Sequence, residues 1–264
     1  MTGVVRHAFV VPAYGQSPYL GECLASLQAQ TRASPIFIST STPSSWLAKV
    51  AAACGATLVE HGPNGGIGRD WNQAVAATPA EWVTLAHQDD VYLPCFAEET
   101  MARVVRHPAA TLVMTDYGEM AGGRPRSWTP MLAIKRLLAE QAFLGRDALV
   151  RRGGKRRLLA FGCAIPCPTV TLRRDVADGL FREDLKVDLD WDAWLRLADA
   201  TGAFVRVRRL CMLHRIHAGS ETSDGVRAGV RAREDAMMFR RLWPAPIARM
   251  LSRLYALSYE AGEP

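Results

Sequence analysis

Short apolar runs alternate with segments of helical spacing along the N-terminal part of the chain. The first run is His7 to Val11, which Pro12 ends. Leu20, Leu24 and Leu27 follow at the spacing of one helix face. The same alternation predicts strands at Ile36 to Ile38, Ala56 to Val59 and Trp82 to Ala86, and helices at Pro18 to Gln28, Trp46 to Cys54 and Trp71 to Ala77. Repeated strand–helix units predict an α/β fold with a mostly parallel central sheet sandwiched by helices.

The pattern changes in the second half. Gly122 begins a stretch without clear periodicity, which extends to Pro168 and which we interpret as irregular. Beyond it, Trp191 and Trp194 mark a helix with an aromatic face. Core packing is favoured for both over a sugar platform, and Trp191 is the better candidate of the two to reach a cleft. The remaining predicted elements are helices at Phe96 to Arg106, Asp190 to Ala198, Val226 to Leu242 and Ile247 to Tyr259, and strands at Ala110 to Thr115, Phe204 to Val207 and Leu210 to His214.

The composition indicates one globular unit. The chain has 264 residues, of which 49% are hydrophobic, so it can bury one substantial core. Six scattered cysteines do not form the dense framework of a small secreted fold, and we expect reduced thiols. Cys163 and Cys167 lack a second pair at ligand spacing, so buried packing is favoured over a zinc site. Because no signal-like segment follows Met1 and no apolar stretch reaches about 18 residues, we expect a cytoplasmic protein.

The net charge of +6 favours an anionic partner, such as a diphosphate, an anionic lipid surface or RNA. The densest basic run, Arg151 to Arg157, is typical of a solvated mobile loop, with a phosphate or membrane contact as the alternative. The arginines of the closing helices suggest peripheral membrane contact. They are Arg227, Arg231, Arg233, Arg240, Arg241, Arg249 and Arg253.

Two adjacent carboxylates, Asp89 and Asp90, follow the apolar strand that ends at Ala86. Ligands of parallel sheets bind beyond the carboxyl ends of the strands. Neighbouring carboxylates repel each other unless a cation is present, and hard oxygen ligands suit Mg²⁺ or Mn²⁺. The pair therefore predicts a metal–diphosphate site, and the alternative is a helix cap or turn.

A glycine-rich segment from Gly62 to Asn72 joins the third strand to a helix. Its glycines would let the backbone approach a phosphate or ribose, although an ordinary flexible turn is the alternative. Trp71 stands where a dinucleotide fingerprint needs its last glycine, so an NAD site is not supported.

Taken together, these segments resemble glycosyltransferase family 2, whose nucleotide-binding fold is called GT-A. The likeness covers an opening strand, an Asn/Gly loop, an acidic metal motif, a segment around a catalytic aspartate and a closing strand. They are Val10 to Tyr14; Asn64, Gly66 and Asn72; Asp89 and Asp90; Asp190 to Ala198; and Leu210 to His217.

The resemblance implies one GT-A domain over residues 1–264, with a nucleotide-sugar-binding half (1–120), an acceptor and catalytic half (121–218) and a C-terminal helical segment (219–264). It also implies an inverting transfer with Mn²⁺ or Mg²⁺, in which Asp190 is the catalytic base and Asp90 and His217 hold the metal. The implied nucleotide-sugar-binding residues are Pro12, Ala13, Tyr14, Thr40, Asn64, Gly66, Asn72, Asp89 and Arg215.

The sequence departs from the family pattern at two places. Ser39 to Thr42 stand where the family has a base-reading carboxylate, so UDP is only the first choice over dTDP or GDP. Leu189 replaces the first member of the acidic pair before the catalytic helix, where Asp188 could compensate. These departures leave a catalytically inactive nucleotide-sugar or glycan-binding relative as the alternative, with a nucleotidyltransferase behind it.

The expected partners are a nucleotide diphosphate sugar and a saccharide or lipid-linked acceptor of cell-envelope synthesis, and no nucleic acid. No motif between Gly122 and Pro168 indicates which acceptor is used.

Overall fold

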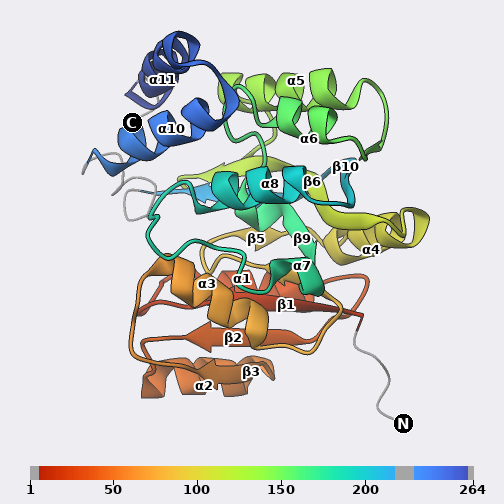
Figure 1. Cartoon of the computed structure of the whole chain (residues 1–264). Helices are drawn as coiled ribbons and strands as arrows, with labels where there is room; N and C mark the ends of the chain where they lie inside the picture. Colours follow the sequence, from red (N-terminus) through yellow and green to blue (C-terminus); the bar gives the residue numbers. More distant parts are fainter. Residues whose placement is uncertain (1–5, 218–228, 261–264) are drawn as a thin grey trace.

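The computed structural model describes residues 6–217 and 229–260, with side chains up to residue 257. Its centre is one sheet in the order β3-β2-β1-β4-β9-β6-β10-β5, with β7 on β6 and β8 on β10 (Figure 1). The strands are β1 (His7–Pro12), β2 (Ile36–Thr40), β3 (Thr57–Glu60), β4 (Trp82–Leu85), β5 (Val91–Tyr92), β6 (Ala110–Ala121), β7 (Arg124–Arg126), β8 (Ala148–Leu149), β9 (Val170–Arg173) and β10 (Ala203–Ile216).

The predicted α/β architecture is confirmed, and the N-terminal part of the sheet is parallel as expected. Strands β3, β2, β1 and β4 run parallel to their neighbours. Strand β9 then enters antiparallel between β4 and β6, so the sheet is mixed. The parallel arrangement places the carboxyl ends of β1, β2 and β4 at one edge, where the loops with candidate chemistry begin.

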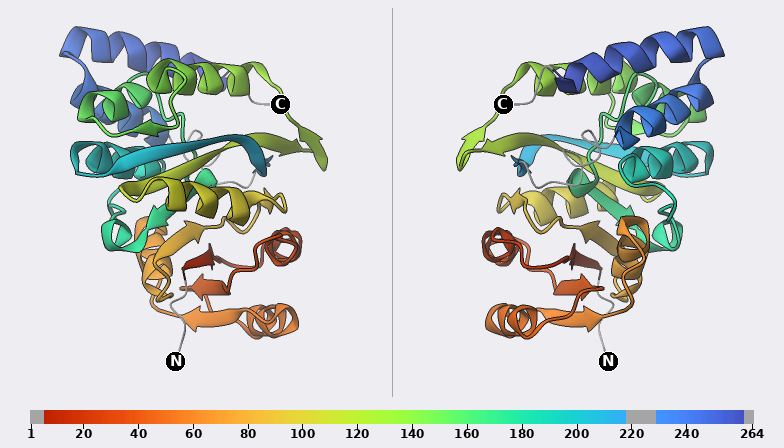
Figure 2. Two further views of the ribbon diagram at one scale, coloured as in Figure 1. Left: turned by 90° about the vertical axis from the view of Figure 1, so that its right-hand side faces the viewer. Right: turned by 90° about the vertical axis from the view of Figure 1, so that its left-hand side faces the viewer.

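Helices cover both faces of the sheet (Figures 1 and 2). Side chains alternate along β1: Phe9 and Val11 pack with α1, α2 and α4, whereas Val10 packs on the opposite face with α3, α5 and α8. The helices are α1 (Leu20–Gln28), α2 (Ser45–Cys54), α3 (Ile67–Ala76), α4 (Phe96–Arg106), α5 (Pro130–Phe143), α6 (Arg152–Leu158), α7 (Arg174–Ala177), α8 (Leu189–Asp199), α10 (Val230–Leu242) and α11 (Ala245–Glu260), with the short 3₁₀ helix η1 (Cys167–Thr169).

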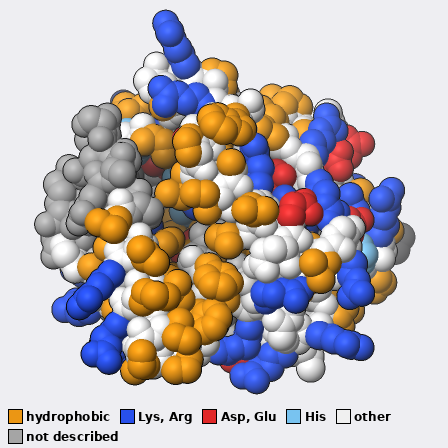
Figure 3. Space-filling view, turned by 90° about the horizontal axis from the view of Figure 1, so that it is seen from above, with side chains coloured by type: hydrophobic (Ala, Val, Ile, Leu, Met, Phe, Trp, Pro, Cys, Tyr) orange, Lys and Arg blue, Asp and Glu red, His pale blue; other side chains and the backbone are white. Residues whose placement is uncertain are grey.

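The stretch predicted to be irregular is mostly ordered, which corrects the sequence interpretation. Helix α5 begins at Pro130, and the Thr129 hydroxyl caps it by accepting from the Leu132 amide at 3.2 Å. In Figures 1 and 2, α5 lies with α10 and α11 in the layer farthest from β3. Apolar side chains gather on the outer surface of this layer (Figure 3).

The basic run from Arg151 to Arg157 is not a mobile loop, because most of it forms α6. Lys155 is 1% exposed, and its ammonium group donates to the backbone carbonyls of Leu197, Ala200 and Gly202 at the end of α8. A cation there satisfies carbonyls that the helix leaves unpaired. The basic run therefore anchors α8, the helix that carries Asp190.

Three further expectations for the second half have different outcomes. Trp191 does not reach a cleft: it is 0% exposed, and its Nε1 donates to the Leu159 carbonyl at 3.2 Å. The two strand-like runs after α8 are one strand, β10, with irregular register between Val207 and Met212. Val226, where we expected a helix to begin, lies outside the described residues, and α10 begins at Val230. Among the helices described, none has the length and apolarity needed to cross a bilayer.

Candidate active site

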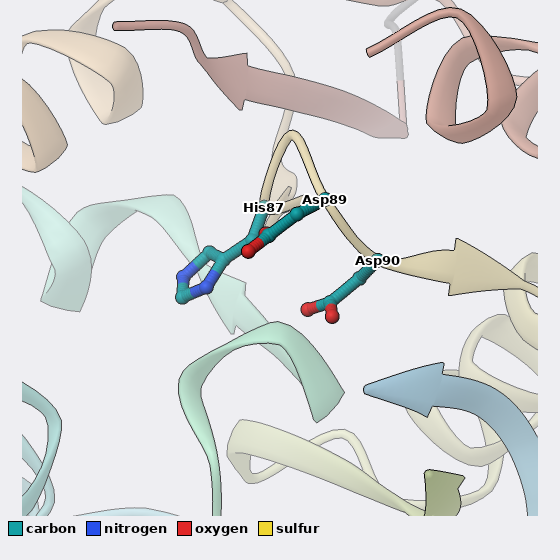
Figure 4. A group of neighbouring side chains, drawn as sticks. All are labelled: His87, Asp89 and Asp90. Carbon is teal, nitrogen blue, oxygen red and sulfur yellow. The ribbon is translucent and has the colours of Figure 1, made fainter. Parts of the chain in front are cut away.

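The loop between β4 and β5 carries the acidic pair. Strand β4 is fully buried, and the chain leaves it at the sheet edge where parallel strands end. Figure 4 shows His87, Asp89 and Asp90 extending from this loop to the same side. Potential ligand atoms of the three residues all lie within 4.8 Å of one another.

Asp90 is 0% exposed and only half satisfied. Its Oδ1 accepts from His214 Nδ1 at 3.0 Å and from the Arg215 amide at 2.8 Å. Its Oδ2 is buried and has no hydrogen-bond partner among the described residues, and the same holds for His87 Nε2. Because leaving buried polar atoms unpaired is costly, a shared ligand is the simplest explanation for both atoms. A divalent cation fits this donor set, and its carboxylate component suits Mg²⁺ or Mn²⁺.

Histidines set the charge of this group. Burial lowers the pKa of His87, although the charges of Asp90 and Asp89 act in the opposite direction. Burial alone would raise the pKa of Asp89, but His87 and the hydrogen bond from His217 outweigh burial and lower it. His217 Nε2 lies 2.8 Å from Asp89 Oδ2. This predicted metal ligand therefore hydrogen-bonds to Asp89 in the structure.

Arg215 fixes the acidic loop to the end of β10. Its Nε donates to the Asp89 carbonyl at 2.7 Å, and its NH2 donates to Glu22 Oε2 at 2.5 Å. The guanidinium lies 4.4 Å from the centre of the Tyr19 ring, and that ring also lies 5.1 Å from the ring of His217. The predicted binding residue therefore also acts as a structural clamp between α1 and the acidic loop.

The end of β1 adjoins the same loop. After Pro12 and the buried Ala13, Tyr14 is an exposed aromatic residue. Its amide donates to Gln88 Oε1 at 3.2 Å, and Gln88 Nε2 donates back to the Tyr14 carbonyl at 3.3 Å. These predicted nucleotide-binding residues thus lie directly beside the acidic pair.

A carboxylate from α3 lies at the end of β2, which the sequence pattern did not reveal. Thr40 is buried, and its hydroxyl accepts from the Thr42 amide at 3.0 Å. The neighbouring Ser41 hydroxyl donates to Asp70 Oδ2 at 2.8 Å. Asp70 comes from α3, so tertiary structure brings a carboxylate to the hydroxyl run that lacks one in sequence.

The Asn/Gly loop divides into two parts. Asn64 is exposed, and its Oδ1 accepts from the Gly66 amide at 2.9 Å, while Gly66 has a φ of 97° that favours glycine. Asn72 instead bonds the Phe181 backbone with both ends of its amide, at 2.8 and 2.9 Å. Asn72 thereby ties α3 to the segment before α8, and its expected donor contact stays a prediction.

The predicted base, Asp190, lies in the first turn of α8. Its Oδ1 accepts from the Trp191 amide at 2.7 Å. Burial raises the pKa of Asp190, although the Trp191 amide, Lys135 and the Cys167 amide act in the opposite direction. A raised pKa brings a carboxyl group closer to the range in which general bases work at neutral pH.

Asp190 belongs to a second group of acidic residues, with Asp188 and Asp235. Asp188 and Asp235 are 4% and 1% exposed. Burial raises the pKa of Asp188 well above its ordinary value, and the charges of Asp235 and Asp190 add to that effect. The cations that lower these pKa values are Lys135 on Asp190 and Arg231 on both Asp188 and Asp190.

The two acidic groups face one short segment. Burial raises the pKa of the Cys167 thiol, and the charges of Asp190 and Asp90 raise it further. Cys167 begins η1, which contacts β4, β6 and β10. Asp90 and Asp190, a hundred positions apart in the sequence, therefore both lie near enough to Cys167 for their charges to act on its thiol.

Several residues of these groups escaped the sequence interpretation. His87 and His214 had a usable signal, since each lies within three residues of a predicted site residue. Lys135 and Asp235 had none, because they come from α5 and α10 and join the site only through packing.

Comparison with known proteins identifies the family and the fold. The model of the family described as Glycosyl transferase family 2 matches residues 8–181. No curated protein matches the chain. Among solved structures, Staphylococcus aureus TarS 1–349 is 15% identical with a TM-score of 0.61, over 94% of this chain and 69% of that chain.

Two further solved structures have the same fold. The mannosyltransferase PcManGT from Pyrobaculum calidifontis, in complex with GDP-Man and Mn²⁺, is 14% identical with a TM-score of 0.64, over 97% of this chain and 70% of that chain. The glucosyl-3-phosphoglycerate synthase of Mycobacterium tuberculosis, with Mn²⁺, UDP and its product, is 17% identical with a TM-score of 0.52, over 94% and 79%. These similarities confirm the predicted fold.

Proposed function

This chain belongs to glycosyltransferase family 2 and is a glycosyltransferase, and we propose that it moves a sugar from a nucleoside diphosphate donor to an acceptor hydroxyl with inversion. The observation that carries the proposal is the pair of acidic groups that both act on Cys167, the first residue of η1. One group holds unpartnered atoms of Asp90 and His87, and the other holds Asp190 with a raised pKa. A leaving diphosphate needs the first kind of group, and a nucleophilic hydroxyl needs the second.

The donor site is proposed at the carboxyl ends of β1, β2 and β4. Asp90 and His87 would hold Mn²⁺ or Mg²⁺, with His217 as a further ligand. When bound, the cation would neutralise negative charge on the diphosphate. Arg215 adds a fixed positive charge beside the pair. The remaining proposed donor contacts come from Pro12, Ala13, Tyr14, Thr40, Asn64, Gly66 and Asp89.

UDP-sugar is the proposed donor. Relatives of the same fold were solved with UDP-GlcNAc, in TarS, and with GDP-Man, in PcManGT. The hydroxyls at the end of β2, with Asp70 behind Ser41, form the polar surface that would contact the base.

The proposed chemical step uses Asp190 as the base. Its carboxylate takes the proton of the acceptor hydroxyl while the oxygen forms a bond to the anomeric carbon. The bond from that carbon to the diphosphate oxygen breaks on the opposite face, so the configuration inverts. The positive charge of Arg215 stabilises the negative charge of the leaving group.

We further propose that the acceptor is a saccharide or lipid-linked intermediate of cell-envelope synthesis, used on the cytoplasmic face of the membrane. Supporting this, the region around Asp190 is built from packed helices, α5, α8, α10 and α11, whereas the donor residues lie in loops.

A calorimetric titration of UDP, dTDP and GDP, with and without Mn²⁺, tests the donor site without knowledge of the acceptor. We expect micromolar binding of one diphosphate that depends on Mn²⁺. Binding of none of the three would favour the alternative of a relative that binds glycans without turnover. Hydrolysis of a UDP-sugar in the presence of Mn²⁺ would then separate the enzyme from that alternative.

A further inference from the structure

Helix α11 exposes four large apolar side chains, whereas Leu251 and Tyr255 pack against the core. Ile247, Met250, Leu254 and Leu257 are between 38% and 59% exposed and recur every three or four residues, which places them on one face of the helix. The inward face carries the small Ala248, which is 1% exposed, and the ring of Tyr255, 5.7 Å from the ring of Phe239. A helix on an ordinary protein surface has the opposite arrangement, with polar residues outside.

Helix α5 repeats this pattern beside α11. Ile134, Leu137 and Leu144 at its C-cap are 53%, 67% and 64% exposed. Both helices belong to the outer layer in Figures 1 and 2, and in Figure 3 apolar side chains gather across this face with Lys and Arg side chains at its margin. We define these three residues and the four of α11 as the apolar face. A gathering of this kind is unusual on a soluble monomer and marks an interaction surface.

The charges that α11 carries beside the apolar face are positive. Arg249 and Arg253 are exposed on α11, on the flank next to Leu257, and neither forms an ion pair with a carboxylate in the described part of the chain. Residues 245–257 contain no Asp or Glu. Arg146, exposed after α5, adds a further positive charge. This differs from the arginine set expected from sequence, in which Arg231 lies 4.0 Å from Asp235 and Arg241 bonds Asp192; Arg227 lies outside the described residues.

We propose that the apolar face docks on the surface of a bilayer that contains anionic lipid. Apolar side chains insert at the headgroup boundary while flanking arginines bind the headgroups, which is how amphipathic helices lie on membranes. A second copy of the chain fits less well, because a two-fold contact between α11 helices would bring arginine against arginine.

Docking would also orient the enzyme. Tyr255, next to Leu254, lies 5.9 Å from the ring of Trp191, the residue after Asp190. The face that meets the membrane is therefore built on the same helix that supports the region of Asp190.

The test is co-sedimentation of the whole chain, at low salt, with phosphatidylcholine vesicles that contain or lack phosphatidylglycerol. Binding is expected only with phosphatidylglycerol. The double variant M250Q/L254Q should bind at least about tenfold more weakly, and R249Q/R253Q roughly tenfold more weakly. The matched controls V105Q and R106Q, exposed on α4, should bind like the natural chain.

Three results would overturn the proposal. The first is no binding of the natural chain to anionic vesicles, and the second is equal binding by M250Q/L254Q. The third is a dimer of the natural chain in sedimentation equilibrium that M250Q/L254Q converts to a monomer, which would make the face an interface between copies. Titration of UDP with Mn²⁺ into each variant is independent of vesicles, so failure of docking and failure of the donor site are distinguishable.

Discussion

The two acidic groups of the site use the same side chain in different surroundings. Asp89 and Asp90 lie on a loop after a buried strand, and His214, His217 and the Arg215 amide hydrogen-bond to them. Asp188 and Asp190 lie at the start of a helix, among other buried carboxylates, and burial dominates their pKa values. The pKa of Asp89 is lowered, whereas the pKa values of Asp188 and Asp190 are raised.

This difference shows that the surrounding groups set the pKa of each aspartate. The charge of His87 and the hydrogen bond from His217 favour the ionised form of Asp89, which is what a cation and a diphosphate require. In the second group burial outweighs the neighbouring donors and cations, so the carboxyl groups of Asp188 and Asp190 hold protons more tightly. The following changes would break or sharpen that contrast.

Changing Asp190→Asn should have the largest effect. The amide cannot accept the hydroxyl proton, so we expect kcat to fall about 10²- to 10⁴-fold while affinity for the diphosphate and Mn²⁺ stays unchanged. Transfer assays and calorimetry measure the two quantities. Asp178→Asn, an exposed change on the same half of the chain, is the control. Full activity of Asp190→Asn would remove it from the mechanism.

Changing Asp90→Asn should act on the other quantity. We expect Mn²⁺-dependent affinity for the diphosphate to fall about 10- to 100-fold, because the charged ligand oxygen is lost. The asparagine Oδ1 can still accept from the Arg215 amide, so thermal unfolding should change little. Chelation of the metal should reduce the natural chain to the affinity of the variant. Equal affinities with Mn²⁺ present would contradict the assignment.

The pH dependence of transfer should report the second group. The active base is the carboxylate, so kcat/KM should fall as the pH decreases through the raised pKa of Asp190, about tenfold per pH unit. This acidic limb should lie above the ordinary aspartate pKa of about 3.9. Diphosphate affinity measured at the same pH values is the control. A limb at the ordinary pKa would show that burial does not tune this residue.

The smallest effect concerns stability. Because the folded-state pKa of Asp188 is raised, its favourable contribution is present below the unfolded pKa and is lost as pH rises through the folded pKa. Asp188→Asn has no such loss. Its free energy of unfolding, measured with urea, should therefore increase relative to the natural chain between pH 4 and pH 8. A constant difference across this range would contradict the raised pKa.

Hydrophobic periodicity predicted the donor half well. The first four predicted strands and the helix at Phe96–Arg106 are present, because each element there buries its own apolar pattern against the sheet. It failed from Gly122 to Pro168, where α5 exposes Ile134 and Leu137 and so lacks a clean polar face. The Thr129 cap followed by Pro130 was the available sign of that helix.

The sequence by itself determined the α/β fold, the family resemblance and the positions of Asp89, Asp90 and Asp190, because these depend on local pattern and short motifs. Only the tertiary structure decided which atoms lie together. It placed His87 and His214 beside the acidic pair, hydrogen-bonded Asn72 to the Phe181 backbone and brought Asp70 to Ser41. Such contacts join residues far apart in the sequence, and burial, which sets their charges, exists only once the chain has packed.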